Sequence, residues 1–64
     1  MRLNKLLKVI SLKTKVAVYT PMGIRRSVLE ELSYGFLKDW GDYQVKDIEQ
    51  EDDYLKILLG DYYG

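Results

Sequence analysis

Residues 15–29 read KVAVYTPMGIRRSVL, a stretch with the pattern of a β-hairpin. Val16 and Val18 alternate with neighbours of other kinds, and a period of two in β-branched and aromatic residues is typical of a half-buried strand. Residues 20–23, Thr-Pro-Met-Gly, then predict a turn, because proline presets φ and glycine permits a positive φ.

Two interpretations fit the residues after this turn. Residues 24–29 continue naturally as the returning strand of the hairpin. Ser27 followed by Glu30 instead matches a capping box, which would open a helix at this point. We favour the strand, and the helical alternative for residues 24–30 stays open.

Helices are expected on both sides of this hairpin. Before it, apolar residues at i, i+3, i+4 and i+7 form one stripe of a helix over about residues 3–11. After it, we expect a short helix over about residues 30–39, which Gly35 weakens by about 1 kcal/mol and Trp40-Gly41-Asp42 ends. The apolar stripe of the first helix consists of Leu3, Leu6, Leu7 and Ile10.

A second hairpin is expected in the last third of the chain. Tyr43 and Val45 alternate, and Ile48 arrives one residue late, so the extra position at residues 46–47 predicts a bulge. The acidic residues 51–53 predict a turn. A strand follows it, with Leu55, Ile57 and Leu59 on one face, and residues 61–64 are expected to form a frayed tail.

Together these elements predict one small α+β domain over residues 1–64, in the order α-β-β-α-β-β. We expect a four-stranded antiparallel sheet made of two hairpins and covered on one face by the helices, which satisfies the layer rule at this length. A chain of 64 residues buries a thin core, and the absence of cysteine excludes disulfide support. Self-association is the remaining support, so we expect a homo-oligomer.

Charge divides the chain into two halves. Residues 1–29 carry seven of the ten cations, for a net charge of +7, and all ten carboxylates lie at Glu30 or beyond, for a net charge of −7. A net charge of zero therefore conceals an asymmetry that indicates an anionic partner, attraction between the halves, or stacking of one molecule on another.

Five stretches of the chain form a recognisable pattern: Leu6-Leu7-Lys8-Val9-Ile10-Ser11, Thr14-Lys15-Val16, Tyr19 with its glycine turn, Val45-Lys46-x-Ile48 and Asp53-x-Leu55-x-Ile57. This pattern resembles that of small uncharacterised phage and prophage accessory proteins of Firmicutes. This chain departs from the usual pattern in its Arg25-Arg26 strand and its Trp40-Gly41 insertion. The resemblance implies a phage accessory gene and carries no known activity.

The residue types argue against catalysis, and we expect no enzyme, no metal and no cofactor. Histidine and cysteine are absent, which removes the usual base near neutral pH and the commonest ligands of transition metals. A calcium loop starting at Asp47 would need glycine at its sixth position and glutamate at its twelfth, where this chain has Asp52 and Leu58. The acidic segment is better explained as a solvated turn.

The candidate binding residues lie on and beside the first hairpin. Arginine forks bind phosphate, and aromatic rings stack on bases, so a nucleotide or single-stranded nucleic acid is a conceivable ligand. The simpler alternative is that these charges solvate the surface or pair with the acidic hairpin. Six tyrosines also exceed what a small core needs, which favours a protein interface. The candidates are Lys15, Tyr19, Arg25, Arg26, Trp40 and Tyr43.

Three functional hypotheses follow. The first is a non-catalytic phage or prophage accessory protein that binds and inhibits a host protein or defence system. The second is a sponge for a small nucleotide signal or a binder of single-stranded nucleic acid. The third is a self-assembling structural protein. No apolar run reaches the roughly 20 residues that a membrane crossing requires, and Lys5 and Lys8 argue against a signal peptide, so we expect a cytoplasmic protein, in the host cell if it is phage-encoded.

Overall fold

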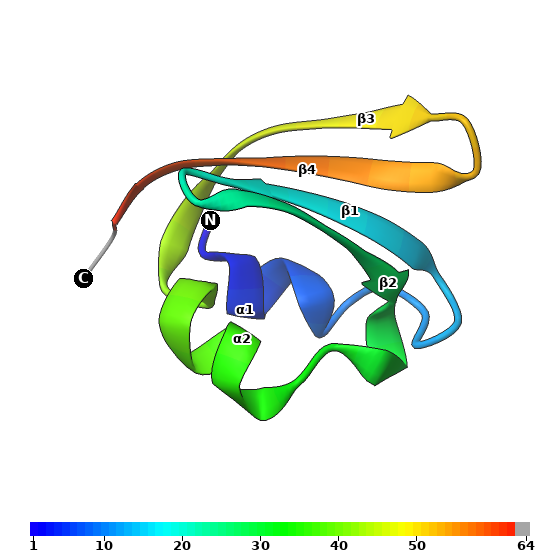
Figure 1. Cartoon of the computed structure of the whole chain (residues 1–64), viewed down its shortest axis with the longest axis horizontal. Coiled ribbons are helices and arrows are strands. Elements are labelled where there is room, and N and C mark those ends of the chain that lie inside the picture. Colours follow the sequence, from blue (N-terminus) through cyan, green and yellow to red (C-terminus); the bar gives the residue numbers. More distant parts are fainter. Residues whose placement is uncertain (63–64) are drawn as a thin grey trace.

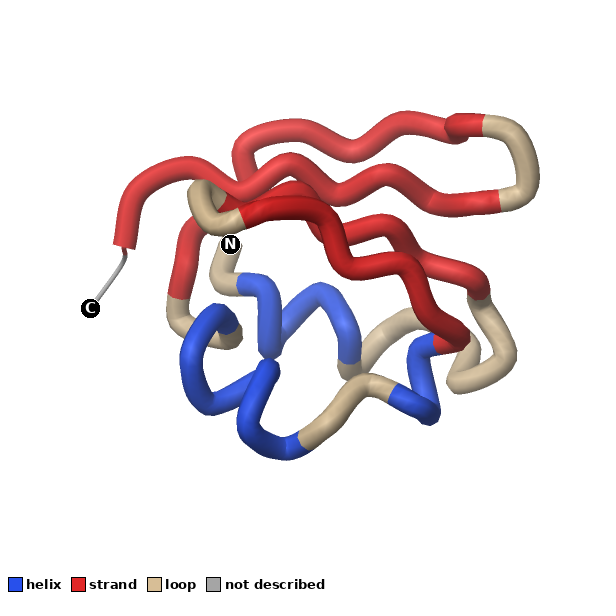
Figure 2. Tube along the Cα trace, in the orientation of Figure 1, coloured by secondary structure: helices blue, strands red, loops and turns tan. Residues whose placement is uncertain are grey.

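The computed structural model describes residues 1–62, which form a four-stranded sheet, two α-helices and one 3₁₀ turn. Figure 2 shows the strands in one layer and the helical turns in another. The predicted α+β class and element order are confirmed. Residues 63–64 of the predicted tail lie outside the described part, and β4 continues to Tyr62. The elements are α1 (Leu3–Leu7), β1 (Lys15–Thr20), β2 (Gly23–Val28), η1 (Leu29–Glu31), α2 (Tyr34–Trp40), β3 (Tyr43–Glu51) and β4 (Tyr54–Tyr62).

The sheet is mixed, so the prediction of a purely antiparallel sheet is wrong. Its strand order is β2-β1-β4-β3. The two hairpins are antiparallel, but β1 and β4 pair in parallel in the centre, from Val16 opposite Leu55 to Tyr19 opposite Leu58. These two strands carry the longest apolar runs, whereas β2 and β3 are rich in charge. Central positions are buried from both sides, which favours apolar strands there and charged strands at the edges.

The connection between the hairpins is a crossover. Because β1 and β4 run parallel, β2 and β3 at the two edges also run in the same direction. Parallel strands need a connection of about a dozen residues or more, and residues 29–42, which contain η1 and α2, provide it. Figure 1 places this crossover and α1 on the same side of the sheet.

The strand interpretation of residues 24–29 is confirmed, with β2 ending one residue earlier. Its six residues pair with β1 without a register shift, and Gly23 takes a φ of 135° at the turn. Ser27 pairs with Val16 in the ladder, and its hydroxyl donates to its neighbour's carbonyl rather than capping a helix. The cap of α2 is Ser33, whose hydroxyl oxygen accepts from the backbone N–H of Phe36 at 3.1 Å.

Two helix boundaries differ from expectation by about four residues: α1 ends earlier than expected, and α2 begins at Tyr34 instead of about residue 30. Helix α1 ends at Leu7 instead of residue 11, because the N–H groups of Lys8 and Val9 bond three residues back and tighten the last turn. The predicted bulge in the second hairpin is confirmed by register shifts between Tyr43 and Val45 and between Val45 and Asp47. The predicted end of α2 at Trp40-Gly41 is also confirmed.

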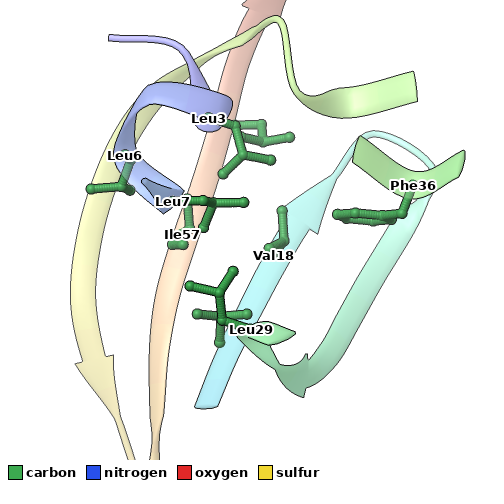
Figure 3. Close-up of a cluster of buried hydrophobic side chains, with 9 residues drawn as sticks. Leu3, Leu6, Leu7, Val18, Leu29, Phe36 and Ile57 are labelled. Carbon is green, nitrogen blue, oxygen red and sulfur yellow. The ribbon is translucent and has the colours of Figure 1, made fainter. Parts of the chain in front are cut away.

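The core lies between the helices and the two central strands (Figure 3). Leu3 from α1, Val18 from β1 and Ile57 from β4 are fully buried, and leucines of α1 and η1 with the ring of Phe36 pack around them. Burying such side chains stabilises by about 1.5 to 3 kcal/mol each. The buried members of this core cluster are Leu3, Leu6, Leu7, Val16, Val18, Leu29, Phe36, Ile57 and Leu59.

Candidate functional site

The sheet has a second face, opposite the core cluster, which we call the outer face. Successive side chains of a strand point to opposite faces. Because Val16, Val18 and Ile57 belong to the core cluster, the residues between them lie on the outer face. Direct partners in the ladder share a face, which adds residues from the edge strands. The outer face therefore carries Lys15, Ala17 and Tyr19 of β1, Ile24 and Arg26 of β2, Tyr54, Lys56 and Leu58 of β4, and Asp47, Glu49 and Glu51 of β3.

Charge is divided across the outer face. The β2 and β1 side carries Arg26 and Lys15, and the far edge, β3, carries Asp47, Glu49 and Glu51. Lys56 lies between them on β4, and Lys46 lies beside Gly60 at one end of the acidic edge. The asymmetry of the sequence thus becomes a charge gradient that runs across the strands.

Tyr19 and Lys56 connect the two sides of this face. The Tyr19 hydroxyl donates to Glu51 Oε1 at 2.7 Å, and Lys56 Nζ donates to Glu49 Oε1 at 3.1 Å. The Lys56 ammonium also lies 4.8 Å from the centre of the Tyr19 ring. The hydrogen bond to Glu51 raises the pKa of Tyr19, with partial desolvation adding to it. The hydrogen bond to Glu49 likewise raises the pKa of Lys56.

Arg25 lies on the opposite face from its neighbour Arg26. Its ladder partner is Val18, a core residue, and its guanidinium carbon lies 5.3 Å from the centre of the Phe36 ring, a cation–π geometry. A depression of about 150 Å³ opens here, lined by Met22, Ile24, Arg25, Phe36 and Trp40 among others. Sites for small molecules usually enclose about 300 to 1,000 Å³, so this depression is small for a nucleotide.

Three aromatic rings gather where α2 ends and the second hairpin begins. The ring centres of Trp40 and Tyr43 are 5.0 Å apart, and those of Tyr43 and Tyr62 are 5.3 Å apart. We call Trp40, Tyr43 and Tyr62 the aromatic cluster. Tyr62 is 61% exposed, and Met22 beside the cluster's Trp40 is 83% exposed. Figure 1 places the β1–β2 turn and the end of β4 at the same end of the molecule.

The six residues predicted as a binding site therefore form two groups. Lys15, Tyr19 and Arg26 lie on the outer face. Arg25 and Trp40 line the small depression on the core side, with Tyr43 in ring contact with Trp40. A wider depression of about 750 Å³ lies between the loop before β1 and the β3–β4 turn, and of the six only Lys15 is among its lining residues.

Met22 and Tyr62 belong to this region and were not among the predicted residues. Tyr62 was expected in a frayed tail, yet it pairs with Tyr43 in the ladder. The two register shifts in the second hairpin have opposite directions, so Tyr43 and Tyr62 pair in the same register as the residues next to the Asp52-Asp53 turn. Counting residues outward from that turn along both strands therefore predicts this pair. For Met22, its position in the middle of a predicted turn is a signal of exposure.

No family model, curated protein or solved structure matches this chain. Within residues 1–62, no helix combines the length and apolar character needed to cross a bilayer. In the same part of the chain, histidine, cysteine and carboxylate side chains form no group of three or more that could hold a metal ion.

Proposed function

We propose that this chain is a non-catalytic accessory protein of phage or prophage origin that acts by binding, as an inhibitor of a host protein or defence system. The observation that carries the binding role is the aromatic cluster with Met22 and Arg25 beside it. The proposed phage or prophage origin of the chain rests on the resemblance of the sequence segments described above.

The composition of this region supports a protein partner. Aromatic residues, methionine and arginine are the types enriched at protein interfaces, and tryptophan, tyrosine and arginine dominate their energetic hot spots. Tyr62 and Met22 are mostly exposed, so a partner could bury them. Trp40 and Tyr43 are partly buried and held by ring contacts, which lowers the entropy lost when a partner binds.

The fold supports this role by leaving the region accessible. The helices and the crossover lie on one side of the sheet (Figure 1), and the aromatic cluster lies where α2 ends and the second hairpin begins. Arg25 is held over Phe36 next to it, so its guanidinium is positioned to donate hydrogen bonds to an acidic side chain of the partner at the rim.

Affinity capture from a lysate of a Firmicutes host tests this function. The wild-type chain should recover one host protein in stoichiometric amount, and adding the chain should lower the activity of that protein. The double variant Met22→Ser, Tyr62→Ser should lose it. Tyr34→Ser is the control, because Tyr34 is 82% exposed but lies at the other end of α2. Repeated capture of no protein, or equal capture by the double variant, would contradict the proposal.

A further inference from the structure

We infer that the outer face of the sheet is a self-association surface, on which two copies pack face to face about a two-fold axis parallel to the strands. This inference does not depend on the aromatic cluster, which lies elsewhere on the molecule. It starts from one row of residues that crosses the sheet.

That row runs from one edge to the other and changes sign along the way. Arg26 of β2 lies opposite Ala17, Ala17 lies opposite Lys56, and Lys56 lies opposite Glu49 of β3. Arg26 and Glu49 are both exposed, and Ala17 is fully buried. The row therefore has a positive end at Arg26, a low position at Ala17, and a carboxylate end at Glu49, which also forms an ion pair with Lys56 of the same copy.

The order of charges selects the direction of the two-fold axis. An axis across the strands would place β2 over β2 and β3 over β3, so that the basic edges face each other and the acidic edges face each other, which like-charge repulsion disfavours. An axis along the strands places β2 over β3 and β1 over β4. Arg26 then faces Glu49 of the second copy, and the symmetry repeats that contact once more.

The same face offers an apolar centre for such packing. Tyr19 and Leu58 are ladder partners in the two central strands and are both half-buried. With the axis along the strands, Tyr19 of one copy lies over Leu58 of the other. Sheets pack face to face about 10 Å apart, with their interior side chains interdigitated.

Edge-to-edge assembly fits the charges and the backbone less well. Two β2 edges would align Arg25 and Arg26 of one copy with the same residues of the other. The β3 edge is blunted, since it contains two register shifts and the N–H of Val45 already donates to the Met1 carbonyl oxygen. Bulges and covered edges of this kind hinder strand addition.

An anionic polymer is also a poorer occupant of the outer face than a second copy. Asp47, Glu49 and Glu51 line one side of it and would repel phosphates. The footprint of four strands is about 400 Å² per copy, below the roughly 800 Å² per partner of a standard interface. The dimer should therefore be weak and sensitive to salt.

Sedimentation equilibrium at low salt tests the inference when charge reversals at two adjacent residues, Arg26 and Arg25, are compared. The wild-type chain should dimerise, and added salt should dissociate it. Arg26→Glu should weaken dimerisation by at least about tenfold, because it sets two carboxylates together at each contact. Arg25→Glu is the control, since it makes the same change on the opposite face of the same strand, and it should leave dimerisation unchanged.

Mixing two variants makes the test specific. Arg26→Glu and Glu49→Lys should each remain monomeric alone, but an equal mixture should form a heterodimer, because every cross-contact then joins opposite charges. Circular dichroism verifies that both variants are folded. A wild-type chain that stays monomeric at high concentration, a dimer lost through Arg25→Glu instead, or a mixture without heterodimer would each overturn the inference.

Discussion

The Tyr19 hydroxyl and the Glu51 carboxylate are 2.7 Å apart, although β4 lies between the strands that carry them. Tyr19 belongs to the basic half of the chain and Glu51 to the acidic half. The tyrosine side chain therefore reaches along and across the outer face, and it ties the first hairpin to the end of β3 independently of the backbone ladder.

This contact predicts a loss of stability at alkaline pH. The pKa of Tyr19 is raised above its usual 10.0, and that of Lys56 above 10.5. Groups with raised pKa values stabilise the folded chain fully below their usual values, and that contribution is lost as pH rises through the raised ones. Melting temperatures should therefore fall above pH 10.0, and less steeply in Tyr19→Phe. Tyr34→Phe should follow the wild type, and an identical alkaline decline in all three chains would refute the link.

Gly41 is required for close approach rather than for an unusual backbone angle. Its φ is −62°, but an added Cβ would collide with the Asn4 side chain and the Leu37 carbonyl oxygen. Gly41→Ala should therefore lower the free energy of unfolding by about 1 to 3 kcal/mol. Gly35 has open space around it, so Gly35→Ala in the same helix should stabilise by about 0.5 to 1 kcal/mol. Urea unfolding of both variants gives the comparison, and equal effects would show that Gly41 is not tightly packed.

Substitution of Ser33 and of Ser27 tests which of the two serines caps a helix, since the structure gives Ser33 and the sequence also suggested Ser27. Ser33→Ala removes the hydroxyl that accepts from Phe36 N–H and should cost about 1 kcal/mol. Ser27→Ala removes only a bond to the adjacent Val28 carbonyl and should cost clearly less. If chemical denaturation ranks the two serines in the reverse order, α2 begins earlier than Ser33.

Ile57 and Ile48 face each other across the β3–β4 ladder but differ in burial. Ile57 is fully buried, whereas Ile48 is 41% exposed. Ile57→Ala should cost about 2 to 5 kcal/mol, enough to unfold much of a domain whose core supplies only about 3 to 5 kcal/mol. Ile48→Ala should cost about 1 kcal/mol or less. Thermal melts distinguish them, and a folded Ile57→Ala chain with wild-type stability would place the core elsewhere.

Much of the local structure was predictable from the sequence. The alternation around Val16 and Val18, the Pro21 turn and the late arrival of Ile48 correctly gave both hairpins and the bulge. The direction in which the hairpins meet was not predictable, because alternation within a strand does not identify its neighbour. The apolar character of β1 and β4 explains why they are neighbours at the centre of the sheet, but not why they pair in parallel.

The candidate site was predictable in part. The sequence grouped Arg25 with Arg26, but a period of two places adjacent strand residues on opposite faces, and the structure separates them accordingly. That Trp40 lies beside Tyr43 was foreseeable from their spacing. The arrival of Tyr62 at the same place depends on the register of β4, which the expected frayed tail concealed.

Trp40 allows the most direct measurement, because it is the only tryptophan in the chain and belongs to the aromatic cluster. Acrylamide quenching of its fluorescence should be measured in the free chain and in the complex with the captured host protein. We predict that the complex protects Trp40 from quenching and shifts its emission to shorter wavelength, as burial of the ring requires. Unchanged quenching and emission in a stoichiometric complex would contradict binding through the aromatic cluster.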